Sequence, residues 1–105
     1  MKSDFYERYF NAVQFFGYFI IASYENETDD QVLENYFNAF IVESELKEDL
    51  KRLKKDLLLI IEYKEKYIND IMNWTNRYFN SSEELGVWLT MIYNKIDEKY
   101  KNLET

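Results

Sequence analysis

The chain has no cysteine and no histidine among its 105 residues. Without cysteine, disulfide bonds and thiolate metal ligands are excluded. Without histidine, the commonest general base and the commonest metal ligand are both missing. The sequence also lacks a Gly-rich phosphate loop and a calcium loop with alternating oxygen ligands around a glycine. We therefore expect no catalytic activity, no metal site and no cofactor.

Helix-breaking residues are equally scarce. Proline is absent, and the only glycines are Gly17 and Gly86. No strand-like alternation of apolar and polar residues lies between turn signals, so the chain is predicted to be all-α. A chain of this length has room for one core. We expect a single domain over residues 1–105, folded as one antiparallel bundle of about five helices, either monomeric or weakly dimeric.

Capping signals and apolar spacing place the helices. The first is predicted from about Asp4 to Ser23, with Ser3 or Asp4 as N-cap and a bend or stop at Gly17. Two capping boxes, in which a Ser or Thr is followed three residues later by Glu or Gln, are predicted to begin later helices. The remaining predictions are a helix after Thr28–Gln31, one from Glu43 or Ser44 to Tyr63, one over Lys64–Tyr78, and one after Ser81–Glu84 with Trp88 facing inward.

Long hydrophobic runs are missing too. The longest, Phe15–Ala22, is too short to cross a bilayer, and no signal-peptide pattern surrounds it, so we expect a cytoplasmic protein without a membrane partner. The basic residues between Lys47 and Lys55 alternate with acids and lack interleaved aromatics, which is typical of a solvated helix face. Together with a net charge of −7, this argues against a nucleic-acid partner.

The net charge comes from one stretch. Tyr9–Leu46 contains no Lys or Arg and seven acidic residues, while the remainder of the chain is balanced. Half of the 20 aromatic residues lie in the same stretch. Pairs such as Asp30–Glu34 could act as acid and base or hold a cation, although a solvated face explains them better. Gathered acids beside amphipathic rings favour capture of a basic partner.

The candidate binding residues lie on the acidic turn and the helix after it. Asp29 has lower weight because it can be occupied with helix capping, and Tyr36 and Phe37 could instead turn into the core. Charge reversal at Glu48 or Asp56, on the next helix, is expected to matter little by comparison. We expect a partner to contact Tyr24, Glu25, Glu27, Asp30, Glu34 and Tyr36.

The order of landmarks resembles a known family. Phe15–Phe19 (FFGYF) is followed by an acidic turn, Asp30–Leu33, a leucine-rich helix and Tyr78–Phe79. A closing Trp88-Leu-x-x-Ile92 completes the order. This resembles the small all-helical immunity proteins of bacterial contact-dependent growth inhibition systems. It departs from them at Ile20–Tyr24, where a polar segment is expected, and in lacking a proline before the last helix.

The resemblance implies a cytoplasmic antidote that binds a cognate toxin domain, often a basic nuclease, and masks its active site. Three alternatives stay open. One is a phage-encoded anti-defence inhibitor that mimics nucleic acid. Another is an immunity protein for a pore-forming bacteriocin, and the third is a structural subunit without an inhibitory role. The genes beside this one would distinguish them.

Overall fold

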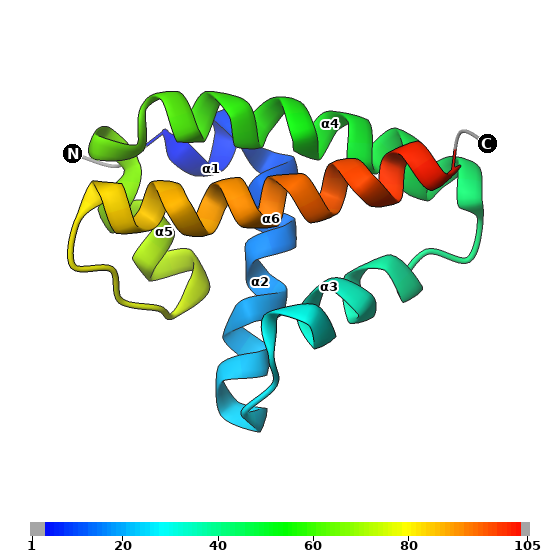
Figure 1. The fold of residues 1–105 in the computed structure, drawn as a ribbon, viewed down its shortest axis with the longest axis horizontal. Coiled ribbons are helices and arrows are strands. Elements are labelled where there is room, and N and C mark those ends of the chain that lie inside the picture. Colours follow the sequence, from blue (N-terminus) through cyan, green and yellow to red (C-terminus); the bar gives the residue numbers. More distant parts are fainter. Residues whose placement is uncertain (1–3, 104–105) are drawn as a thin grey trace.

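A computed structural model describes residues 4–103, which form six helices and no strand (Figure 1). The all-α class is therefore confirmed, with five of the helices longer than one or two turns. The elements are α1 (Phe5–Arg8), α2 (Phe10–Glu25), α3 (Asp29–Asn38), α4 (Glu43–Glu62), α5 (Lys64–Thr75) and α6 (Ser82–Leu103).

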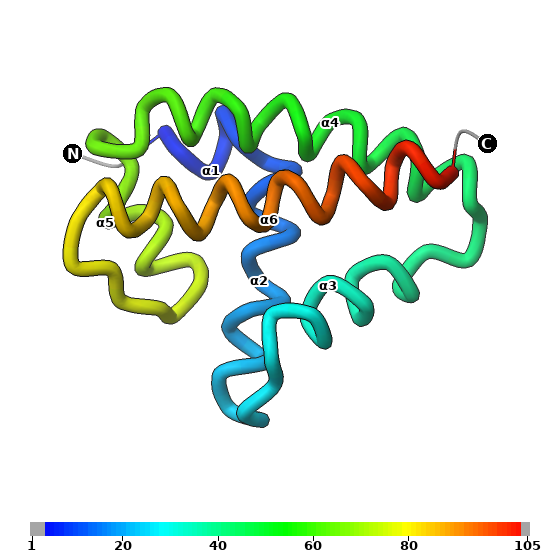
Figure 2. The backbone as a smooth tube through the Cα atoms, in the orientation of Figure 1, coloured from blue at the N-terminus to red at the C-terminus, as the bar shows by residue number. Residues whose placement is uncertain are grey.

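The two longest helices, α4 and α6, lie side by side and run in opposite directions (Figures 1 and 2). Helix α2 crosses this pair instead of running along it, and it contacts α3, α4 and α5. The arrangement is therefore a compact helical bundle built around one antiparallel pair, which α2 crosses. Each helix contributes a stripe of buried apolar side chains, as in Leu46, Leu50, Leu53, Leu57 and Ile60 of α4.

The first predicted helix is two helices, and the break is not at Gly17. It lies at Tyr9, whose backbone leaves the helical region at φ −122° and ψ 46°. The Tyr9 ring is buried against Phe5 and Tyr67, and its hydroxyl donates to the Tyr67 hydroxyl at 3.1 Å. Helix α2 continues through Gly17, where an added Cβ would meet nothing within 4 Å. Aromatic packing, which the glycine signal does not reveal, therefore sets the break.

Two helices end at an asparagine in the left-handed conformation. Asn26 follows α2 with φ 55°, and Asn76 follows α5 with φ 56°. Asparagine tolerates this conformation better than most residues, which makes it a frequent helix terminator. The fourth predicted helix consequently ends at Thr75 and not at Tyr78.

One of the two predicted capping boxes is complete. The Thr28 hydroxyl accepts from the Gln31 backbone N–H, and the Gln31 side chain accepts from the Thr28 N–H. At the start of α6 the Ser81 hydroxyl accepts from the Glu84 N–H, but the Glu84 carboxylate accepts from Asn80 instead of returning to Ser81. The second box is therefore only half formed.

Aromatic rings join the core across its elements. Trp88 of α6 is partly buried, with its ring 5.1 Å from Phe19 and 5.3 Å from Phe79 between centroids. Trp74 of α5 is also partly buried, and its ring lies 5.6 Å from that of Tyr6 in α1. The inward placement predicted for Trp88 is thus confirmed in part. Across residues 4–103 no helix combines the length and hydrophobicity needed to cross a bilayer.

Candidate partner-binding site

The end of α2 and the turn after it form an acidic tip, which we define as Ile21, Tyr24, Glu25 and Glu27. The tip lies at the lower end of the molecule as drawn in Figure 1. Tyr24 is 80% exposed and Ile21 is 61% exposed, so two large apolar side chains stand in solvent beside the acids. Tyr24 was a candidate from the sequence, whereas Ile21 was not, because it lies inside an apolar run that is otherwise largely buried.

The two glutamates of the tip interact with each other. A side-chain hydrogen bond to Glu27, together with its negative charge, raises the pKa of Glu25. The Asn35 side chain of α3 donates to the Glu27 carboxylate at 2.7 Å. Glu25 is exposed, and within the described residues neither glutamate is in an ion pair. The tip therefore keeps its negative charge facing solvent.

Asp30 and Glu34 lie one turn apart on the exposed face of α3, as their spacing predicts. They border an open groove of about 330 Å³ between α3 and α6, which Phe37, Lys95 and Lys99 also line. The Lys95 ammonium lies 2.6 Å from the Asp30 carboxylate, which raises the pKa of Lys95. Asp30 is therefore partly neutralised within the fold, and Glu34 is the freer of the two acids.

Tyr36 lies inside the core and is only 2% exposed. Its ring packs against Phe15, and its hydroxyl donates to the Asp49 carboxylate of α4. Burial and this carboxylate raise the pKa of Tyr36. A ring in this position joins α3 to α4 and presents no surface to a partner, so we leave Tyr36 out of the candidate binding surface.

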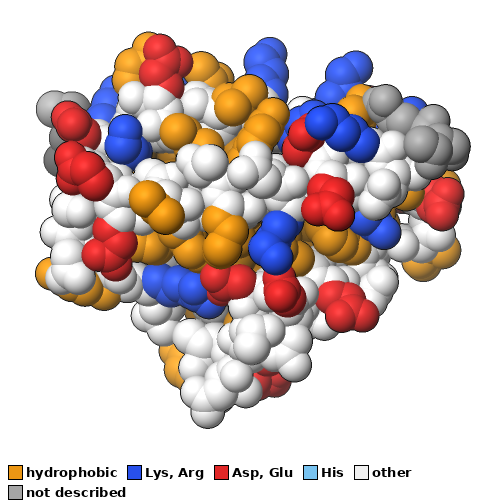
Figure 3. All heavy atoms as spheres, viewed as in Figure 1, with side chains coloured by type: hydrophobic (Ala, Val, Ile, Leu, Met, Phe, Trp, Pro, Cys, Tyr) orange, Lys and Arg blue, Asp and Glu red, His pale blue; other side chains and the backbone are white. Residues whose placement is uncertain are grey.

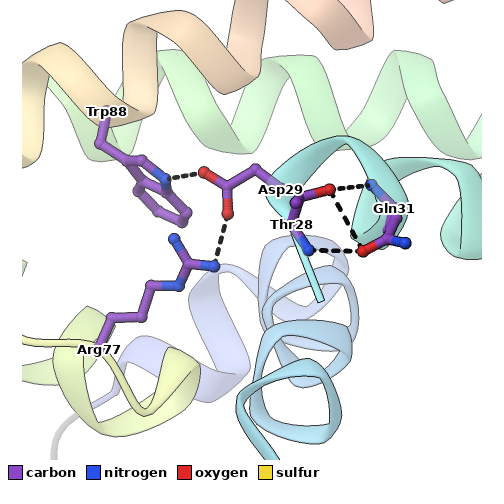
Figure 4. A network of polar contacts seen from close by, with 5 residues as sticks. All are labelled: Thr28, Asp29, Gln31, Arg77 and Trp88. Carbon is purple, nitrogen blue, oxygen red and sulfur yellow. Dashed lines mark hydrogen bonds and ion pairs between the residues drawn. The ribbon is translucent and has the colours of Figure 1, made fainter. Parts of the chain in front are cut away.

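The Asp29 carboxylate interacts with other side chains and does not cap the backbone of its own helix. One carboxylate oxygen accepts from the Trp88 indole N–H at 2.9 Å, and the other lies 2.5 Å from the Arg77 guanidinium (Figure 4). Arg77 in turn lies over the rings of Phe19 and Trp88. These contacts fix the start of α3 against α6 and the loop before it, directly beside the Thr28 capping box. Asp29 thus positions the start of α3, the helix that carries the candidate residues Asp30 and Glu34.

Asp56 has a structural role that its sequence pattern does not reveal. Its half-buried carboxylate accepts from the backbone N–H of Ala12 at 3.2 Å and also hydrogen-bonds the backbone of Asn11. It therefore caps α2 from α4, at the terminus where Tyr9 offers no side-chain cap. A Lys at Asp56 would meet these backbone donors, so charge reversal there would disturb the start of α2. That it matters little for partner binding stays a prediction. Glu48 is exposed and remains a suitable control.

The acidic stretch is partly balanced by residues distant in sequence. Arg77 pairs with Asp29, and Lys95 pairs with Asp30. A scan along the chain cannot see these pairs, since each joins residues about 50 or 65 positions apart. Among the candidate acids, Glu25, Glu27 and Glu34 have no ion pair with any residue of the described range 4–103. No cluster of three or more metal-ligating side chains occurs within residues 4–103.

No protein-family model matches this chain, and no curated protein or solved structure matches it either. Of the resemblance to a known family, only the coarse description is confirmed: the chain is a small, compact, all-helical protein. Any statement on function therefore rests on the residues and their geometry.

Proposed function

We propose that this protein is a stoichiometric inhibitor, an immunity protein that binds a basic toxin domain and covers its active site. The observation that carries the proposal is the acidic tip, where exposed Tyr24 and Ile21 stand beside Glu25 and Glu27. A large apolar ring is retained in solvent there, although burial in the core would stabilise the fold. The order of landmarks in the sequence, which resembles that of immunity proteins of contact-dependent growth inhibition, supports the same function.

The two kinds of side chain have separate tasks. The carboxylates attract a positively charged surface and speed the encounter. Tyr24 and Ile21 supply the apolar centre from which water is excluded, and this centre carries most of the binding energy in typical interfaces. A toxin whose groove binds phosphates would present the complementary positive charge. The role requires no turnover, no cofactor, no nucleic acid and no membrane, and we place it in the cytoplasm.

The test searches the genes beside this one for a basic toxin domain and measures the association and dissociation rates of that domain at several salt concentrations. Absence of binding by every such domain would count against the proposal. Reversing the charge at Asp30 and Glu34 together should slow association and flatten its dependence on salt, because both residues are exposed on α3. Glu48→Lys, on the exposed face of α4, is the matched control and should leave the rate nearly unchanged.

Tyr24→Ala tests the apolar part of the acidic tip. Its effect is expected in the dissociation rate, with a loss of about 2 kcal/mol of binding free energy. Because Tyr24 is exposed, circular dichroism and the melting temperature of the variant should match the parent. Unchanged affinity for both Tyr24→Ala and the Asp30/Glu34 variant would overturn the proposal for this surface.

A further inference from the structure

The groove between α3 and α6 has charges of both signs along it. Its charged residues are Asp30 and Glu34 of α3 with Lys95 and Lys99 of α6, and Phe37 supplies an aromatic ring. Figure 3, in the orientation of Figure 1, shows basic and acidic side chains close together between these two helices, with hydrophobic side chains among them. Two acids and two lysines balance, so the lining of the groove is neutral in a chain whose net charge is −7.

The two lysines contact different groups of α3. The Lys95 ammonium lies 2.6 Å from the Asp30 carboxylate. One turn further along α6, the Lys99 ammonium lies 5.4 Å from the centre of the Phe37 ring. Asp30 and Phe37 are seven positions apart, or two turns, so they lie on the same face of α3. The fold thus marks two cation-binding positions on one helix face, a carboxylate and an aromatic ring.

Glu34 lies between these two positions. It follows Asp30 by four residues and precedes Phe37 by three, so the three side chains share the groove face of α3. Within residues 4–103 Glu34 is in no ion pair, whereas Asp30 is paired with Lys95. The face therefore has one unpaired carboxylate, one carboxylate that an internal lysine occupies, and a ring beside them.

The ion pair between Lys95 and Asp30 is exposed. The Asp30 side chain is 76% exposed and that of Lys95 is 39% exposed, so water solvates both charges when they separate. Exposed pairs of this kind contribute little to the stability of a fold. Lys95 can therefore leave Asp30 without displacing α3, whose position is set by its buried residues and by the Asp29 contacts.

We propose that Lys95 is an internal competitor for Asp30, which an arginine of the basic partner displaces when it enters the groove. The inference rests on the proposed function and names the group by which the partner binds. A guanidinium has five N–H donors in a planar fork and stacks on aromatic rings. One arginine can thus donate to both Asp30 and Glu34, which are one turn apart. The Phe37 ring, one turn beyond Glu34, offers it a surface on which to pack.

The competitor makes the groove selective. An ammonium is a point charge, so a lysine of the partner would replace Lys95 with an equivalent group and gain little. An arginine gains a second carboxylate, Glu34, with which Lys95 forms no ion pair. Of the other acids that act on Lys95, Asp29 is paired with Arg77 and Glu98 lies on the same helix as Lys95. Lys95 therefore raises the affinity that a partner's cation must exceed, and arginine exceeds it more readily than lysine.

Titration with a short peptide that carries two arginines, followed through the NMR signals of the α3 amides, tests the competitor. Lys95→Met should bind the peptide several-fold more tightly than the parent, because Asp30 is released. Lys101→Met is the matched control, since it also removes one positive charge of α6 and one ion pair, with Asp97, but does not line the groove. Its affinity should stay close to the parent's. Circular dichroism should show both variants folded like the parent.

Two further comparisons identify the contact. In an Asp30→Asn background Lys95→Met should bring little gain, and a peptide with lysines in place of the arginines should bind the parent several-fold more weakly. The inference is overturned if Lys95→Met gains no more than Lys101→Met, or if its gain persists without the Asp30 carboxylate. Equal binding of the two peptides, or no response of the α3 signals in Lys95→Met, would also overturn it.

A toxin domain separates this inference from the proposed function. A domain that binds the parent, but binds Lys95→Met no more tightly than Lys101→Met, would overturn the inference and leave the proposed function standing. The expected peptide response without any binding domain among the neighbouring genes would count against the proposed function alone.

Discussion

Helices α2 and α3 begin in two different ways. The N-terminus of α3 has its cap in the adjacent sequence, because Thr28 and Gln31 satisfy each other's backbone N–H groups. The N-terminus of α2 has no local side-chain cap, and its donors are satisfied by Asp56, 44 positions further along the chain. The start of α3 can be identified from four consecutive residues. The cap at the start of α2 forms only when α4 packs against α2.

This difference has an energetic side. The Thr28 hydroxyl is exposed and uncharged, so the cap changes little with pH. Asp56 is half-buried, and the loss of water around its carboxylate raises its pKa despite the backbone donors that favour ionisation. A distant cap thus links two helices, but it carries a desolvation cost that the local cap avoids. Four predictions test the comparison.

Trp88→Ala is expected to have the largest effect on stability. It tests whether the start of α3, like that of α2, depends on residues distant in the sequence. Loss of the ring leaves Asp29 without its indole donor and opens space beside Phe19 and Phe79. We expect a loss of about 3 kcal/mol in the free energy of unfolding, measured by urea denaturation. Trp88→Phe keeps most of the packing and should lose much less. Equal losses for the two variants would show that the indole hydrogen bond, and not the ring, dominates.

Asp56→Ala should follow, with a loss of about 1–2 kcal/mol in the free energy of unfolding. The reason is that the N–H of Ala12 would lose its acceptor in a partly buried place. Asp56→Asn retains an acceptor oxygen and is the matched control, expected to stay close to the parent. If the alanine variant were as stable as the parent, solvent would be satisfying the start of α2.

Thr28→Ala removes the local cap and should cost about 1 kcal/mol in the same measurement. Thr28→Ser keeps the hydroxyl and should be nearly neutral. The variants Thr28→Ala and Asp56→Ala touch separate helix termini, so their losses should add. A marked departure from additivity would mean that the two starts form as one unit.

The pH dependence of stability is the smallest expected effect, and only the Asp56 cap should show one. Because the pKa of Asp56 is raised in the folded chain, above its ordinary value of 3.8, the folded state keeps a proton that the unfolded chain has released. The stability of the parent relative to Asp56→Asn should therefore fall as pH rises through this interval, and level off above it. Thr28→Ala should differ from the parent by the same amount at every pH. A stability difference between parent and Asp56→Asn that rises with pH would contradict the assigned direction.

The sequence was sufficient wherever the information is local. The bounds of α4 and the start of α3 follow from apolar spacing and the Thr28–Gln31 box, and both were predicted closely. The break at Tyr9 was not, since it depends on packing against Tyr67, 58 residues away. The same limit applies to the candidate site. Exposure of Tyr24 fits its predicted role, but the burial of Tyr36 and the pairing of Asp30 with Lys95 arise only from tertiary structure.

The positions of the two tryptophans make them separate fluorescent reporters of these regions. Trp74 lies against Tyr6 of α1, just before the break that precedes α2. Trp88 contacts both Arg77 and the Asp29 carboxylate at the start of α3. In a Trp88→Phe background the remaining emission would report the α1–α5 contact, and in Trp74→Phe it would report the α3 corner. Loosening the Asp56 cap should therefore change the emission of Trp74 before that of Trp88, so that the order in which the two ends of α2 open becomes a measurable quantity.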